Sequence, residues 1–116
     1  MILTLDVEPN ILSSLGKMLE KEGHAVLLAA SGPDAVELVR KGTPDLIVMD
    51  VDLSEPSGVE TLERIQKIAP EVPVVLTAAI GPGEAVWPLF RRGSYCFLPK
   101  PFRVPELKSA IRKSLA

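Results

Sequence analysis

The sequence has little cysteine, no excess of basic charge and no long apolar run. Its single cysteine, Cys96, excludes an intrachain disulfide, and no cluster of cysteine and histidine is present for a zinc site. Lysine and arginine number 13 against 15 aspartate and glutamate residues, whereas proteins that bind nucleic acid through its phosphates normally have a basic excess. We therefore expect no direct contact with DNA or RNA.

No stretch of the chain approaches the roughly 18 consecutive apolar residues of a membrane span. Asp6 and Glu8 interrupt what would be the apolar core of a signal peptide. Hydrophobic residues make up 47% and charged residues 24% of the 116, which is typical of a globular domain. We therefore expect a soluble, cytoplasmic protein without a membrane partner, in which residues 1–116 form a single domain.

Short apolar runs alternate with segments of helical periodicity along the whole chain. The runs lack polar alternation, which is typical of strands in a parallel sheet covered on both faces, and they occupy residues 2–5, 25–29, 46–49, 72–76 and 96–98. Helical patterns follow each run, at 11–22, 31–41, 57–69, 83–92 and from 105 onward, with Leu107, Ile111 and Leu115 facing inward in the last. This order predicts an α/β fold: an open parallel sheet with helices on both faces.

Polar residues close several of the predicted strands. Ligands of an open α/β sheet bind beyond the carboxyl ends of its strands, where this sequence places Asp6, Asp50, Thr77-Ala78 and Lys100. Two carboxylates at one edge suit Mg²⁺, and Asp50 could act as the nucleophile of phosphoryl transfer with Lys100 stabilising the transferred oxygens. The glycine-rich loop of a dinucleotide fold is missing after the first strand, which argues against NAD and ATP as ligands.

A series of segments then carries a family resemblance. In order, the segments are Ile2-Leu-Thr-Leu-Asp6 with Glu8-Pro9-Asn10, Ala30-Ser-Gly32, Pro44-Asp-Leu-Ile-Val-Met-Asp50, Gly58, Val72-Pro-Val-Val-Leu-Thr-Ala78, Gly93, and Phe97-Leu-Pro-Lys-Pro-Phe102. Together, at these spacings, they resemble a response regulator receiver domain of two-component signalling over essentially the whole chain. The resemblance implies a (βα)5 flavodoxin-like, doubly wound sheet with strand order 2-1-3-4-5.

The resemblance also implies a function and the residues that perform it. Asp50 would accept a phosphoryl group from a sensor histidine kinase or a phosphotransfer protein. Mg²⁺ would be held by Asp6, Asp50 and the main-chain carbonyl of Asp52. Lys100, joined to the following proline by a cis peptide bond, would contact the phosphoryl oxygens, and Thr77 would move its hydroxyl toward them.

Phe97 matches the aromatic residue whose inward rotation accompanies activation in this family. The output would be a population shift at the face built from helix 4, strand 5 and helix 5. The same face could pair two copies in a homodimer. Such a protein is a signalling switch and not an enzyme, beyond promoting its own phosphorylation and dephosphorylation.

The sequence departs from the family pattern at the metal site and at the hydroxyl position. Val7 stands where the family usually carries a second metal-binding acid, a change that we expect to weaken Mg²⁺ binding and that Asp52 could partly offset. A gapless alignment from Asp50 to Lys100 places Ala78 at the hydroxyl position, whereas the local Thr-Ala pattern favours Thr77. A shift of one residue turns a strand side chain to the other face, so this choice matters.

Two further departures concern the loops and the output face. Ser54 replaces the usual proline four residues after the phosphoacceptor, with Pro56 nearby. Pro88 and the segment Gly81-Pro82-Gly83 alter the predicted fourth helix.

Three hypotheses follow from these observations. The first is a phosphorylation-controlled receiver, and the second is a degenerate receiver that acts as a protein-interaction module without phosphorylation. The third is a phosphatase, because Asp50-Val-Asp52-Leu-Ser54 resembles the nucleophile motif of haloacid-dehalogenase-like phosphatases. That family also needs a downstream acidic pair, and no aspartate follows Asp52.

Overall fold

The computed structural model describes residues 1–6, 8–50, 58–78 and 95–115. The strands and helices in these residues are, in chain order, β1 (Ile2–Leu5), α1 (Pro9–Lys21), β2 (Val26–Ala29), α2 (Gly32–Lys41), β3 (Leu46–Asp50), α3 (Gly58–Ile68), β4 (Val74–Ala78), β5 (Tyr95–Pro99) and α5 (Val104–Leu115). The strands form one parallel sheet in the order β2-β1-β3-β4-β5. The predicted doubly wound fold is confirmed. The predicted helix at residues 83–92 lies outside the described residues.

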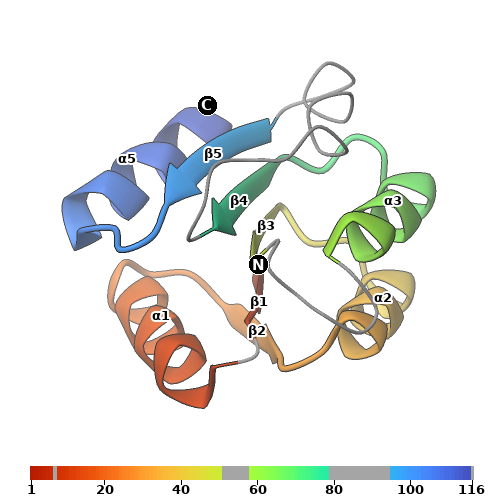
Figure 1. Ribbon diagram of the computed structural model, residues 1–116, viewed down its shortest axis with the longest axis horizontal. Helices are drawn as coiled ribbons and strands as arrows, with labels where there is room; N and C mark the ends of the chain where they lie inside the picture. Colours follow the sequence, from red (N-terminus) through yellow and green to blue (C-terminus); the bar gives the residue numbers. More distant parts are fainter. Residues whose placement is uncertain (7, 51–57, 79–94, 116) are drawn as a thin grey trace.

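The sheet is the middle of three layers. Figure 1 shows α1 and α5 on one side of the sheet and α2 and α3 on the other. Each side has its own apolar core: Leu62 and Ile65 of α3 are buried in one, and Leu19 of α1 and Leu107 of α5 are buried in the other. Because helices cover both faces, the central strands need apolar side chains at every position, which explains their unbroken apolar runs.

Short-range signals in the sequence set the helix ends. The Ser31 hydroxyl accepts a hydrogen bond from the Asp34 N–H at 3.3 Å and caps the first turn of α2. Gly23 follows α1 with a φ of 91°, a left-handed conformation that glycine adopts without the steric cost of a side chain. None of the helices in the described part of the chain is long and apolar enough to cross a membrane.

Two expectations drawn from local pattern are wrong. The fourth strand is β4, residues Val74–Ala78, and not residues 72–76. Val72 instead donates its N–H to the Ala69 carbonyl in the turn that follows α3, and Pro73 has no N–H to contribute to a strand. Leu115 was expected to face inward but is 41% exposed, because it ends the last turn of α5.

Candidate functional site

The strand register brings four polar side chains to one face and one edge of the sheet. Successive side chains of a strand alternate between its faces, so residues two apart share a face. The core under α1 and α5 contains a side chain from each of the four strands β1, β3, β4 and β5. An even number of residues separates that strand position from the polar residue at the end of the same strand, which is Asp6, Asp50, Thr77 or Lys100. All four therefore belong to that face, at the carboxyl ends of β1, β3, β4 and β5, where the sequence predicted a site.

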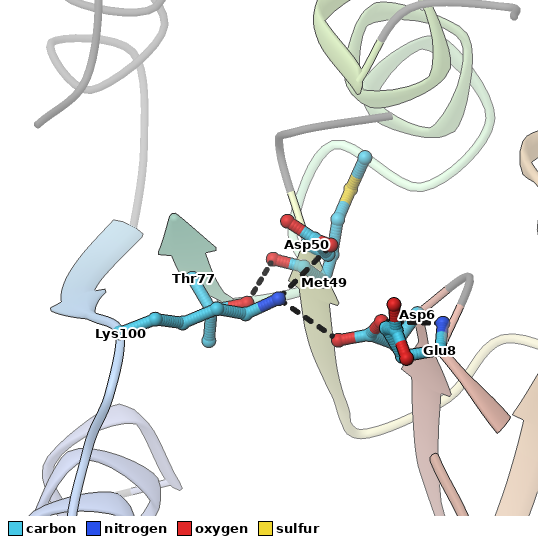
Figure 2. Close-up of polar contacts among 6 residues, drawn as sticks. All are labelled: Asp6, Glu8, Met49, Asp50, Thr77 and Lys100. Atoms are coloured by element: carbon cyan, nitrogen blue, oxygen red, sulfur yellow. Dashed lines mark hydrogen bonds and ion pairs between the residues drawn. The ribbon is translucent and has the colours of Figure 1, made fainter. Parts of the chain in front are cut away.

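A buried ionic cluster forms the centre of the site, as Figure 2 shows. The Lys100 ammonium lies 3.1 Å from Asp6 Oδ2 and 3.0 Å from Asp50 Oδ2, so one cation bridges two carboxylates. The side chains of Asp6 and Asp50 are only 2% and 5% exposed, and that of Lys100 is 18% exposed. Because these side chains have so little contact with water, each charge needs an opposite charge beside it. A buried charge is costly in free energy unless it is paired.

Opposing effects act on the charge of Lys100. Burial lowers the pKa of this lysine, but its hydrogen bonds to Asp50 and Asp6, together with their charges, outweigh the effect of burial. The pKa of Lys100 is therefore raised above its ordinary value of 10.5. The lysine is a cation at every physiological pH, and it can attract an anionic group as well as neutralise a carboxylate.

Thr77 lies beside Asp50 in the register of β3 and β4. Its hydroxyl donates a hydrogen bond to the carbonyl of Met49 at 3.4 Å, and its side chain is buried. Ala78 is one residue further on and therefore points to the other face of the sheet, away from the face of Asp50. Of the two candidates for the hydroxyl position, Thr77 is the one on the face of the carboxylates.

Phe97 lies on the face opposite to the ionic cluster. It is half-buried and packs against the apolar core under α2 and α3. Lys100 lies three residues later, so its side chain points to the opposite face of the sheet, where it joins the ionic cluster. β5 and the residue that follows it therefore contribute to both faces of the sheet, through Phe97 on one and Lys100 on the other. The Lys100–Pro101 peptide bond is cis.

The donor set suits a hard divalent cation, but it is small. Asp6 and Asp50 offer buried carboxylate oxygens, the ligands that Mg²⁺ prefers. Within the described ranges no group of three or more acidic, histidine or cysteine side chains could hold a metal ion. Asp52, expected to add a main-chain carbonyl, lies outside the described residues, as do Val7, Ser54 and Pro56.

An apolar groove borders the site, and the sequence did not reveal it. The groove has a volume of about 600 Å³ and lies between α1 and the turn that joins β5 to α5. Its walls include Ile11 and Met18 on one side and Phe102 and Val104 on the other, and Lys100 lies at its margin. The helical stripe of α1 includes Ile11 and Met18, but their place beside α5 depends on the tertiary fold.

Comparison with known proteins agrees with this geometry. Residues 2–112 match the response regulator receiver domain family. The chain is 30% identical over 114 residues to sporulation initiation phosphotransferase F of Bacillus subtilis (strain 168), covering 98% of this chain and 92% of that protein. It is 31% identical to the transcriptional regulatory protein GlrR of Escherichia coli (strain K12), but it spans only 26% of that protein's length.

Solved structures give the same result. A CheY-like response regulator receiver domain protein from Methanospirillum hungatei JF-1 superimposes with a TM-score of 0.89 at 26% identity, covering 98% of this chain and 91% of that one. The receiver domain of NtrX from Brucella abortus gives a TM-score of 0.87 at 31% identity, covering 99% and 98%. With the sheet order and the family match in agreement, the chain belongs to the response regulator receiver domain family of two-component systems.

Proposed function

We propose that this chain is a phosphorylation-controlled receiver that accepts a phosphoryl group on Asp50 in a Mg²⁺-dependent reaction. The observation that carries the proposal is the bridge from Lys100 to both Asp50 and Asp6. A cation already in contact with the acceptor carboxylate can stabilise the oxygens of the group that arrives there. The donor would be a phosphohistidine of a sensor kinase or of a phosphotransfer protein.

The chemistry assigns a role to each side chain. A carboxylate oxygen of Asp50 attacks phosphorus, the bond from phosphorus to the donor histidine nitrogen breaks, and that nitrogen keeps the electron pair. Lys100 turns from the carboxylates toward a phosphoryl oxygen, and the Thr77 hydroxyl leaves the Met49 carbonyl to bind another. Mg²⁺, held by Asp6, Asp50 and the main-chain carbonyl of Asp52, would neutralise charge on the transferred group.

The apolar groove supports a protein donor. It lies beside the residue that contacts the acceptor carboxylate, and it offers Ile11, Met18 and Val104 as apolar contacts. Val104 is 50% exposed, so a partner helix that covers it would bury apolar surface and bring its histidine toward Asp50. The output face of helix 4, strand 5 and helix 5, and a homodimer through it, stay predictions, because residues 83–92 lie outside the described residues.

The second candidate is a degenerate receiver that binds a partner without phosphorylation. Val7 favours it, because this residue adds no carboxylate where the family usually has a metal ligand. The third hypothesis, a haloacid-dehalogenase-like phosphatase, has no support from the family match. Asp50 also closes the third strand of the sheet, whereas the nucleophile motif of those phosphatases normally opens the domain.

One experiment separates the first two candidates. The chain is incubated with acetyl phosphate with and without Mg²⁺, and its intact mass is recorded beside that of Asp50→Asn. The proposal expects a single phosphoryl adduct that requires Mg²⁺ and is absent from the variant. No adduct at any Mg²⁺ concentration, in a protein that is folded by circular dichroism, favours the degenerate module. Recovery of the adduct in Val7→Asp would identify the missing ligand as the cause.

A further inference from the structure

A second group of charged side chains lies where α1 ends, far from the ionic cluster of Asp50. Glu22 follows the last residue of α1, and its Oε1 accepts a hydrogen bond from the Lys108 ammonium of α5 at 2.5 Å. Both side chains are partly exposed, Glu22 at 37% and Lys108 at 36%. His24 and Arg112 line the same small recess between the two helices. Among the described residues, this is the ion pair that joins the end of α1 to α5.

The cations around Glu22 favour its ionised form. The hydrogen bond from Lys108 and the charge of that ammonium lower the pKa of the Glu22 carboxyl below its ordinary value of 4.5, and they outweigh the effect of burial. The charges of Arg112 and His24 lower the pKa further. Glu22 is therefore a carboxylate at physiological pH, and the ion pair with Lys108 is complete there.

The interhelical ion pair, Glu22–Lys108, lies at one end of the apolar groove. Figure 1 shows α1 and α5 on the same side of the sheet, and the groove runs between them. Met18 of α1 lines both the groove and the recess that contains Glu22 and Lys108. Residues four apart on a helix share one side of it, so Glu22 continues the side of Met18, and Lys108 continues the side of Val104. Each member of the ion pair thus extends one wall of the groove.

We propose that the interhelical ion pair holds α1 and α5 at a fixed separation and so positions the two walls of the groove for a helix of the protein donor. This inference rests on the proposed function and concerns the docking step. A partner that contacts both walls binds more tightly when they are already ordered, because less conformational freedom is lost on binding. Glu22 and Lys108 are positioning residues, since neither contacts the reacting atoms. An ion pair so exposed adds little to global stability, so its loss should leave the chain folded.

Amide hydrogen exchange tests the ion pair without any phosphoryl donor. Lys108→Gln removes the ammonium, and the amides that end α1, including the His24 N–H bonded to the Leu19 carbonyl, should exchange about twofold to fivefold faster. Lys108→Arg keeps the charge and should exchange at the native rate. The matched control is Lys113→Gln, which removes the same charge from an exposed position of α5 and should change nothing. In the native chain, about 1 M NaCl should reproduce the effect of Lys108→Gln, because salt screens exposed charges.

Unchanged exchange in Lys108→Gln overturns the inference, and so does equal acceleration in Lys108→Arg or Lys113→Gln. These outcomes do not depend on whether Asp50 accepts a phosphoryl group.

The docking role is measured with a phosphorylated histidine phosphotransfer domain that phosphorylates the native chain. Lys108→Gln should raise the half-saturating concentration of this donor about twofold to fivefold and leave the maximal rate unchanged, while Lys108→Arg restores the native value. The rate with acetyl phosphate, which needs no docking surface, should stay the same. Faster amide exchange with an unchanged half-saturating concentration overturns the positioning role. If the native chain accepts a phosphoryl group from neither donor, the proposed function fails and the docking role with it, whereas the exchange rates still decide whether the ion pair holds α1.

Discussion

Replacing Lys100 by methionine should destabilise the fold by about 3 kcal/mol. Methionine matches the lysine side chain as far as Cε but lacks the ammonium that Asp6 and Asp50 share at 3.1 and 3.0 Å. Removing one partner of a buried ion pair costs about 3 to 5 kcal/mol, because the remaining charge stays in a poorly solvated place. The lower end of that range applies here, since the Lys100 side chain keeps 18% of its surface in water.

The loss is measured by urea unfolding at pH 7, followed by circular dichroism. Asp6→Asn supplies the matched control, because in the Lys100→Met background it removes one of the two carboxylates that then face each other. We expect it to recover part of the lost stability, with a coupling free energy of about 2 kcal/mol between the two sites. Asp6→Asn in the native background should be destabilising, because it breaks one contact of Lys100.

A loss below about 1 kcal/mol in Lys100→Met would refute the reasoning, since that is the value of an exposed ion pair. Additive effects of Lys100→Met and Asp6→Asn would refute it equally. Either result would mean that water, and not the carboxylates, solvates the ammonium.

Three more predictions concern pH and glycine. Because the pKa of Lys100 is raised above 10.5 in the folded protein, its contribution to the free energy of unfolding is fully present below pH 10.5 and is lost as the pH rises through the higher folded-state pKa. The difference in stability between the native chain and Lys100→Met, measured by urea unfolding, should therefore stay constant from pH 7 to 10 and shrink only above 10.5. A difference that shrinks below pH 10 would contradict this. Gly23→Ala should destabilise by about 1 kcal/mol in the same assay, because φ is 91° there, and no loss would contradict the assigned backbone. Gly16→Ala should instead stabilise α1 by up to about 1 kcal/mol in thermal unfolding, because the new methyl group meets only the half-exposed side chain of Leu28, at 3.1 Å. A net loss of stability would show that the Leu28 side chain cannot move aside.

Much of the fold could be predicted from local sequence. Unbroken apolar runs predict strands covered on both faces, and Ser31 and Gly23 mark helix ends by backbone chemistry that acts within a few residues. The first and last residues of a strand could not be predicted in this way, because the same apolar residues fit a strand or the turn before it. Val72 is apolar, yet its N–H closes a turn with Ala69, and only the pairing with β3 decides where β4 begins.

The residues of the candidate site, too, could be predicted only in part from the sequence. Asp6, Asp50 and Lys100 could be found from sequence because each directly ends or follows a strand, and all parallel strands end at one edge. Position alone could not choose between Thr77 and Ala78, since a shift of one residue reverses the face. The register with Asp50 places Thr77 on the face of the carboxylates.

The sequence by itself determined the order of strands and helices, and which polar residues stand at strand ends, because these depend on neighbours along the chain. The tertiary structure decided the contacts across it: Lys100 reaches Asp6 over a separation of 94 residues, and the apolar groove joins α1 to the turn before α5. Such contacts depend on the order of the strands and on the twist and register of the sheet, which no single segment encodes.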